Sequence, residues 1–160
     1  MLKTKVFKSK DLKFILRLYN QSVKEKVSYQ NNIIKFKDHK DWINLNIKKK
    51  KIFIDILYNK KKRIGYLRFN KLKKKIFSVS IVLDRKYRNK GFGKKLLGLS
   101  IKKFLSKNKG DIFSYIKTEN LKSINIFKNN FFRKISKREF YSQTQKKIHS
   151  NKFSFFIYKK

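Results

Sequence analysis

Several residue types that support particular chemistries are missing or scarce. The 160-residue chain has no cysteine, which excludes disulfides, thiolate metal sites and a covalent acyl-cysteine route. Its two histidines, His39 and His149, lie far apart in sequence and suggest no ligand cluster, so we expect no metal site. No apolar run approaches the roughly 18–20 residues that cross a membrane, and the N-terminus lacks an apolar signal region. We therefore expect a soluble, cytoplasmic protein without a membrane span.

Acidic residues are also scarce. Nine Asp and Glu stand against 46 Lys and Arg, which gives a formal net charge of +37. A basic surface attracts nucleic acids. However, alanine and proline are absent while Lys, Asn, Ile, Phe and Tyr, which A/T-rich codons encode, are abundant. We interpret the charge as a product of genome composition. Nucleic acid is therefore an unfavoured partner, but a surface of this charge should attract anionic small substrates.

The apolar pattern predicts a single domain, residues 1–160, of the α/β (α+β) class. The expected order is strand, two helices, three strands, helix, strand, helix and two closing strands. Together they predict one mixed sheet flanked by helices. Residues 141–152 are expected to be a loop. The predicted strands include Ile52–Tyr58, Ile64–Phe69, Ile76–Leu83, Ile112–Ile116 and Phe153–Tyr158.

A glycine loop joins the third of these strands to a helix. Two of only five glycines, Gly91 and Gly93, lie where the strand hands over to the helix, in the pattern Arg88-x-x-Gly91-x-Gly93. Glycine lets a loop backbone approach a ligand closely, and the free N–H groups of a helix N-terminus bind phosphate. Two glycines alone also fit a turn that needs glycine only for packing. The pattern is neither a P-loop nor the three-glycine dinucleotide fingerprint.

The loop and its context resemble the acetyl-CoA signature of the GNAT superfamily of acetyltransferases. A second signature lies downstream, where Asn120, Ser123, Phe127 and Phe132 resemble the family pattern of an Asn, a small residue, an aromatic and a closing Phe. The resemblance covers roughly residues 3–135. It implies a GNAT-like fold, with one mixed, mostly antiparallel central sheet of six to seven strands flanked by about four helices. It also implies an N-acetyltransferase that uses acetyl-CoA as its co-substrate, with no metal.

The resemblance also implies a set of coenzyme-binding residues. The strand before the loop holds the pantetheine and thioester, and the Leu83 amide is the candidate oxyanion donor. Asn120 contacts the coenzyme near its reacting end, although a helix N-cap is an equally good interpretation of this residue. The full set is Ile81, Val82, Leu83, Arg88, Asn89, Lys90, Gly91, Phe92, Gly93, Lys94, Asn120, Ser123 and Phe127.

The acid and the base are less well defined. Transfer needs a neutral amine, so a base must accept a proton, and the candidates are Glu119, Asp84 and His39. For each of them a purely structural role is also open. Many family members have a proton-donating Tyr where this chain has Phe127, and Phe cannot donate a proton. Tyr115, Tyr87 or water could protonate the leaving thiolate instead.

Three residues suggest the class of acceptor: His39, Trp42 and Arg68. Their layout resembles that of a subgroup that acetylates nucleotide-activated amino sugars. These are the UDP-4-amino-sugar N-acetyltransferases of the pseudaminic acid pathway. In that case Trp42 stacks on a ring and Arg68 pairs with a diphosphate. Core packing of Trp42 and a first-turn polar role for His39 stay open.

A ribosomal-protein or peptide N-terminal acetyltransferase is the alternative, and a non-enzymatic, basic nucleic-acid-binding protein is a third hypothesis. A homodimer is also open.

Overall fold

Seven strands form one sheet in the computed structural model, which describes residues 1–159. Their order across the sheet is β1-β2-β3-β4-β5-β7-β6, and every neighbouring pair is antiparallel except β4 and β5. This confirms the mixed, mostly antiparallel sheet. The strands are β1 (Leu2–Val6), β2 (Ile52–Asn59), β3 (Lys62–Lys73), β4 (Ile76–Leu83), β5 (Asp111–Lys117), β6 (Arg133–Ile135) and β7 (Phe153–Tyr158).

Five α-helices flank this sheet in the described part of the chain, one more than the sequence predicted. They are α1 (Leu12–Lys24), α2 (Phe36–Lys48), α3 (Phe92–Leu105), α4 (Leu121–Lys128) and α5 (Lys137–Thr144). The missed helix is α5, which runs into the segment expected to be a loop. Its N-cap, Ser136, accepts a hydrogen bond from the Glu139 N–H, but it buries only Phe140 and Thr144, so its apolar pattern is weak. Two short 3₁₀ turns, Ser9–Asp11 and Arg85–Tyr87, complete the chain's regular structure.

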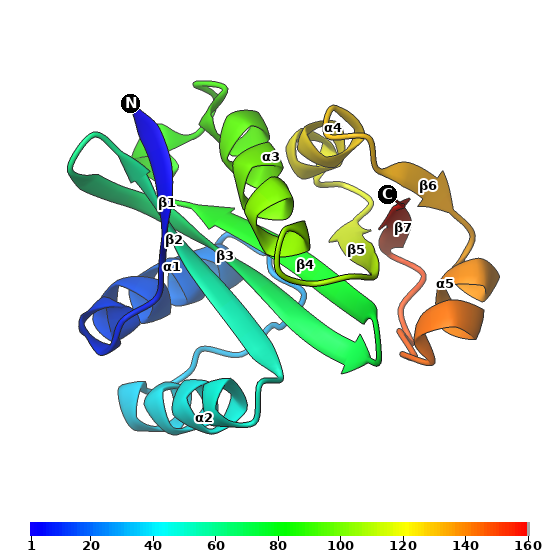
Figure 1. Cartoon of the computed structure of the whole chain (residues 1–160), viewed down its shortest axis with the longest axis horizontal. Helices are drawn as coiled ribbons and strands as arrows, with labels where there is room; N and C mark the ends of the chain where they lie inside the picture. Colours follow the sequence, from blue (N-terminus) through cyan, green and yellow to red (C-terminus); the bar gives the residue numbers. More distant parts are fainter. Residues whose placement is uncertain (160) are drawn as a thin grey trace.

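The helices cover both faces of the sheet (Figure 1). Side chains alternate along each strand, so Leu67 and Phe69 of β3 pack under α3, whereas Tyr66 packs with α1 and α2. On the far half of the sheet, Phe113 of β5 packs with Phe140 of α5. Because Phe77 and Ile112 are register partners in one cluster, Phe113 faces the same side as α1 and α2. One face therefore carries α3 and α4, and the other carries α1, α2 and α5.

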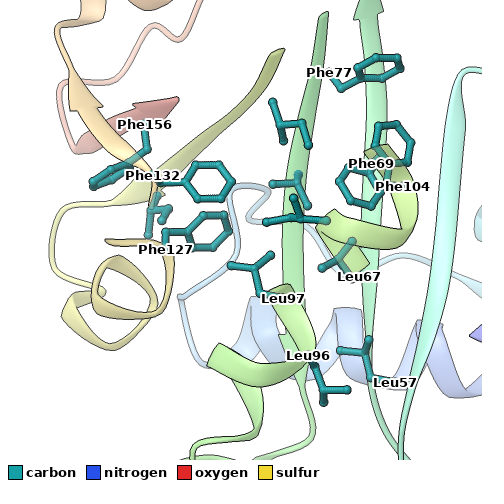
Figure 2. Packing of buried hydrophobic residues seen from close by; sticks show 14 of the residues in the cluster. Leu57, Leu67, Phe69, Phe77, Leu96, Leu97, Phe104, Phe127, Phe132 and Phe156 are labelled. Carbon is teal, nitrogen blue, oxygen red and sulfur yellow. The ribbon is translucent and has the colours of Figure 1, made fainter. Parts of the chain in front are cut away.

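A group of aromatic rings fixes α3 to the sheet. Figure 2 shows Phe104 of α3 against Phe69 of β3, with Phe77 of β4 close by. The Phe69 and Phe104 rings are stacked with centroids 3.9 Å apart, and Phe77 meets Phe104 edge-on at 4.9 Å. Such pairs add to the stabilisation from burial. This packing sets the position of α3 and hence of the loop before it.

No helix in residues 1–159 has the length and apolar character needed to span a membrane.

Replacing Phe104 should destabilise the protein strongly. The side chain is 7% exposed, so Phe104→Ala leaves a cavity between α3 and the sheet and should lower the free energy of unfolding by about 3–5 kcal/mol. Chemical denaturation measures this. The control is Leu99→Ala on the same helix, 45% exposed, which should change stability by roughly 0.5 kcal/mol or less. Equal losses in the two variants would contradict the packing described.

Candidate active site

The site begins where two neighbouring strands part. β4 and β5 pair only from Ile76 with Asp111 to Ser78 with Phe113, although both strands continue beyond. Where the strands part, the Ser114 hydroxyl of β5 donates a hydrogen bond of 3.2 Å to the Val79 carbonyl of β4. This side-chain hydrogen bond takes the place of a backbone hydrogen bond between the two strands. A cavity of about 800 Å³ lies at the gap, and its lining includes both separated strand ends.

The separated end of β4 presents backbone groups to this gap. The Asp84 N–H donates to the Ile64 carbonyl of β3, whereas the Val79 carbonyl faces β5. Backbone direction alternates along a strand, so Ile81 and Leu83 face the gap and Val82 faces β3. The Leu83 carbonyl already accepts a hydrogen bond of 3.0 Å from the Arg88 Nε. The Leu83 N–H is left as the candidate oxyanion donor, as the sequence suggested.

The glycine loop follows β4 directly and leads into α3. Asn89 and Gly91 both have left-handed backbones, with φ of 60° and 71°, and α3 begins at Phe92. A Cβ on Gly91 would meet no atom within 4 Å, so glycine is favoured there by its φ. A Cβ on Gly93 would lie 2.7 Å from Ile126 Cδ1, so glycine is favoured there by close packing on α4. The open N–H groups of the first α3 turn then lie at the cavity wall, ready for an anion.

Arg88 connects this loop to the rest of the cavity. Its guanidinium forms an ion pair with Glu25, which caps the end of α1, while its Nε holds the end of β4. Burial alone would raise the pKa of Glu25, but hydrogen bonds from Arg88 and Gln21 outweigh burial and keep that pKa below its usual value. Glu25 was not among the predicted site residues, because its role depends on a partner 63 residues away.

Most of the predicted coenzyme-binding residues come together at the cavity. All of them line it except Lys90 and Phe92. The Asn120 side chain accepts a hydrogen bond of 3.2 Å from the Ser123 N–H, so it caps α4 and also lies at the cavity wall. Phe127 is buried with its ring 4.9 Å from that of Phe132. These residues belong to the α3 and α4 face of the sheet.

The other half of the cavity lies on the face of α1, α2 and α5. It is aromatic and contains a partly buried cation, Arg68. Its lining includes Tyr19, Tyr66, Arg68, Ser80, Tyr115 and Phe153. The Arg68 Nε is buried without a hydrogen-bond partner, and the guanidinium lies 5.1 Å from the centre of the Trp42 ring. Trp42 itself is 42% exposed and does not line the cavity. The cavity therefore passes through the sheet, from a loop suited to phosphate to a pocket containing Arg68.

Burial also shifts the titration of the tyrosines in this half. It raises the pKa of Tyr66 and that of Tyr115 to about 12, although the charge of Arg68 acts in the opposite direction on both. Both hydroxyls therefore carry their protons at neutral pH. Tyr115, which lines the cavity, can donate a proton there, whereas Tyr87 does not line it.

None of the three predicted bases lines the cavity. Asp84 is buried in an ion pair of 2.7 Å with Arg17, and Glu119 is exposed. Burial, with a smaller effect of the Arg68 charge, lowers the pKa of His39 to about 4, and its ring lies 5.9 Å from that of Tyr19. The carboxylate that lines the cavity is Glu25.

Comparison with known proteins identifies relatives of this arrangement. The acetyltransferase (GNAT) family matches residues 15–131. A similar solved structure is that of yncA of Salmonella typhimurium with its cofactor acetyl-CoA, at a TM-score of 0.79 and 14% identity over 99% of this chain and 93% of that one. A spermidine N-acetyltransferase of Vibrio cholerae with CoA and spermine has a TM-score of 0.78 and 15% identity, covering 98% and 92%.

A ribosomal-protein-alanine N-acetyltransferase of Brucella melitensis is similar as well, with a TM-score of 0.77 and 13% identity over 97% of this chain and 96% of that one. No curated protein matches the sequence. At these identities the structural likeness concerns the fold, and the substrates of these enzymes differ from one another.

A charge at Gly91 should prevent coenzyme binding. Gly91→Asp places a carboxylate beside the expected pyrophosphate, so we expect the Kd for coenzyme A to rise by roughly 100-fold or more. Gly91→Asn is the matched control, because Asn tolerates a left-handed backbone and has no charge, and it should change Kd by less than about 10-fold. Calorimetry with coenzyme A measures both. Equal affinities in the two variants would contradict the loop assignment.

The Asp84–Arg17 pair should make stability depend on pH. Burial would raise the pKa of Asp84, but hydrogen bonds from Arg17 and the Lys86 N–H hold it below its unfolded value of 3.8. Its contribution is therefore present above that pH and is lost as the pH falls through the lower, folded pKa. Asp84→Asn should lose about 1 kcal/mol at about pH 7 and much less at about pH 2.5, as measured by denaturation. Asp41→Asn, at an exposed residue, should show no such dependence.

Proposed function

This chain belongs to the acetyltransferase (GNAT) family, and on that premise we propose that its acceptor is an amine bearing an anionic group, best represented by a nucleotide-activated amino sugar. The donor side is established with the family: the protein is an N-acetyltransferase with acetyl-CoA as co-substrate. The third hypothesis, a non-enzymatic nucleic-acid-binding protein, is therefore wrong. We expect the reaction to take place in the cytoplasm, where acetyl-CoA is available, and a homodimer stays a prediction.

In the proposed reaction the two substrates meet in the gap between β4 and β5. Acetyl-CoA lies on the α3 and α4 side, with its pyrophosphate at the loop Arg88–Lys94 and its thioester beside Leu83. The acceptor enters from the side of Tyr19 and Arg68. As the amine attacks, negative charge develops on the thioester oxygen, and the Leu83 N–H stabilises it. Tyr115 or water protonates the thiolate, because Phe127 stands where the usual tyrosine would be.

The charge of the lining carries the proposal about the acceptor. Its one carboxylate in the described chain, Glu25, is already paired with Arg88. Its cationic residues are Arg68, Arg85, Arg88, Lys94, Lys117 and Lys122. Those near the loop can bind the coenzyme phosphates. Arg68, with its buried and unpartnered Nε, is left for an oxyanion of the acceptor, and the tyrosines around it can stack on a sugar or base.

This charge argues against a polyamine acceptor. The Vibrio cholerae relative acts on spermidine, which is a cation. Here a cation would face Arg68 without a free carboxylate in the lining to offset the repulsion. A peptide N-terminus, the acceptor class of the Brucella melitensis relative, carries a single ammonium and remains the second candidate.

Arg68 should determine acceptor affinity. Arg68→Met removes the charge but keeps much of the apolar stem, so we expect the KM for a UDP-4-amino sugar to rise roughly 10-fold or more with little change in the Kd for acetyl-CoA. Thiol release and calorimetry measure the two constants. Arg138→Met on α5, at an exposed residue away from the cavity, is the control and should change neither. Turnover of ribosomal N-terminal peptides with none of the UDP-amino sugar would favour the second candidate.

A further inference from the structure

We propose that this enzyme supplies no general base to its acceptor and instead selects amines of low intrinsic pKa, such as a sugar amino group or an α-amino group, which it takes up in the neutral form. The proposal rests on the proposed function, since it concerns the same cavity. It adds a chemical criterion for the acceptor, namely a low amine pKa. The reason for this criterion lies in the groups that face the half of the cavity on the side of α1, α2 and α5, which we call the acceptor half.

Among residues 1–159, no side chain that lines this half is placed to accept a proton. Glu25, at the end of α1, is paired with Arg88 and has a lowered pKa, which makes it a weak base. Burial raises the pKa values of Tyr19, Tyr66 and Tyr115, so these hydroxyls can donate protons but not remove them. His39 on α2 lies behind Tyr19, outside the lining.

Cations surround the same space. Arg68 projects from β3, and Lys117 of β5 lies at the wall, where its Nζ donates a hydrogen bond of 2.8 Å to the Lys26 carbonyl. Lys146, after α5, lies outside the lining but over the rings of Tyr29 and Tyr115 at 5.9 and 5.5 Å, and burial, with a smaller effect of the Arg68 charge, lowers its pKa. Positive charges near an amine disfavour its ammonium form and so lower its pKa. The cavity thus favours a neutral amine without a base that removes the proton.

The intrinsic pKa of the acceptor then controls the rate. An α-amino group has a pKa of about 7.7–8.0 and a lysine-type alkyl amine one of about 10.4. At neutral pH the neutral fraction therefore differs by roughly 300-fold between these classes. Without a base to compensate, that difference should appear directly in kcat/KM.

The proton balance of the reaction follows. The acceptor ammonium first loses one proton to water, and the nitrogen lone pair then attacks the thioester carbonyl carbon. The C–N bond forms, the C–S bond breaks, and the thiolate leaves with the electron pair. A second proton leaves nitrogen for water as the amide forms. The thiolate gains a proton from water, either directly or through Tyr115, which is then reprotonated by water. The products are the acetylated amine, coenzyme A thiol and one proton in solution.

The experiment compares two acceptors with the same anion. UDP linked to a 4-amino sugar and the 6-aminohexyl ester of UDP differ mainly in amine pKa; an α-amino peptide and its Nα-acetylated lysine counterpart form a second pair. CoA release is followed over about pH 6 to 10. We expect a preference of roughly 100-fold or more in kcat/KM for the low-pKa amine near pH 7, which narrows as the pH rises, and an acidic limb of kcat/KM that follows each amine's own pKa.

A matched pair of variants tests the role of charge. Ser80 on β4 is the register partner of Arg68 on β3 and lines the cavity. Ser80→Asp adds a carboxylate beside that guanidinium, so it should stabilise the bound ammonium form of either amine and move the acidic limb of kcat to higher pH. Ser80→Asn, similar in size but neutral, should leave the limb in place. A pH profile that moves with charge and not with size distinguishes an electrostatic effect from a packing change.

Each other outcome has a definite meaning. If the two amines of a pair share one acidic limb, or react equally well near pH 7, a protein base operates and the proposal is wrong. If Lys146→Met abolishes that limb, Lys146 is the base, which also overturns the proposal. Both results leave the proposed function intact. If no amine of either pair releases CoA, the proposed function itself fails, and this inference fails with it.

Discussion

The parting of β4 and β5 is the constraint on which the rest of the structure depends. Unpaired backbone groups inside a protein are costly, so a sheet that opens must satisfy them in another way or reserve them for a ligand. This protein does both. Ser114 and Arg88 take up the carbonyls of Val79 and Leu83, whereas the N–H groups of Ile81 and Leu83 face the gap. The gap is therefore prepared for a ligand with carbonyl acceptors.

The opening also separates two kinds of binding. On the α3 and α4 face, a helix N-terminus and a left-handed loop suit phosphates. On the α1, α2 and α5 face, tyrosines surround Arg68. The Arg88–Glu25 pair links the two, because it ties the phosphate loop to the end of α1, and the chain after α1 walls the acceptor half. Binding of a ligand in one half of the cavity should therefore influence how well ordered the residues that line the other half are.

The sequence predicts the local parts of this site and not the distant ones. The strand Ile76–Leu83 and the loop Arg88–Gly93 were predictable, since glycine spacing and apolar runs reflect local backbone demands. The catalytic base could not be predicted in the same way, because that role depends on the direction in which a side chain points. Asp84 follows the separated strand directly, yet the turn at Arg85–Tyr87 leaves it facing Arg17 of α1. Glu25 and Tyr19 reach the cavity only through tertiary packing, and α5 was missed because it buries only two side chains.

The unusual charge of the chain acquires a functional meaning at this point. Five of the nine carboxylates are held in ion pairs, namely those of Asp11, Glu25, Asp55, Asp84 and Glu139. Cations outnumber acids about five to one, so a carboxylate near the acceptor readily finds a cation, and for Glu25 the pairing with Arg88 lowers its pKa and its strength as a base. We therefore expect a cavity in such a protein to bind amines that are already neutral. Genome composition can thus have set the charge, while the charge restricts which amines the enzyme can acetylate.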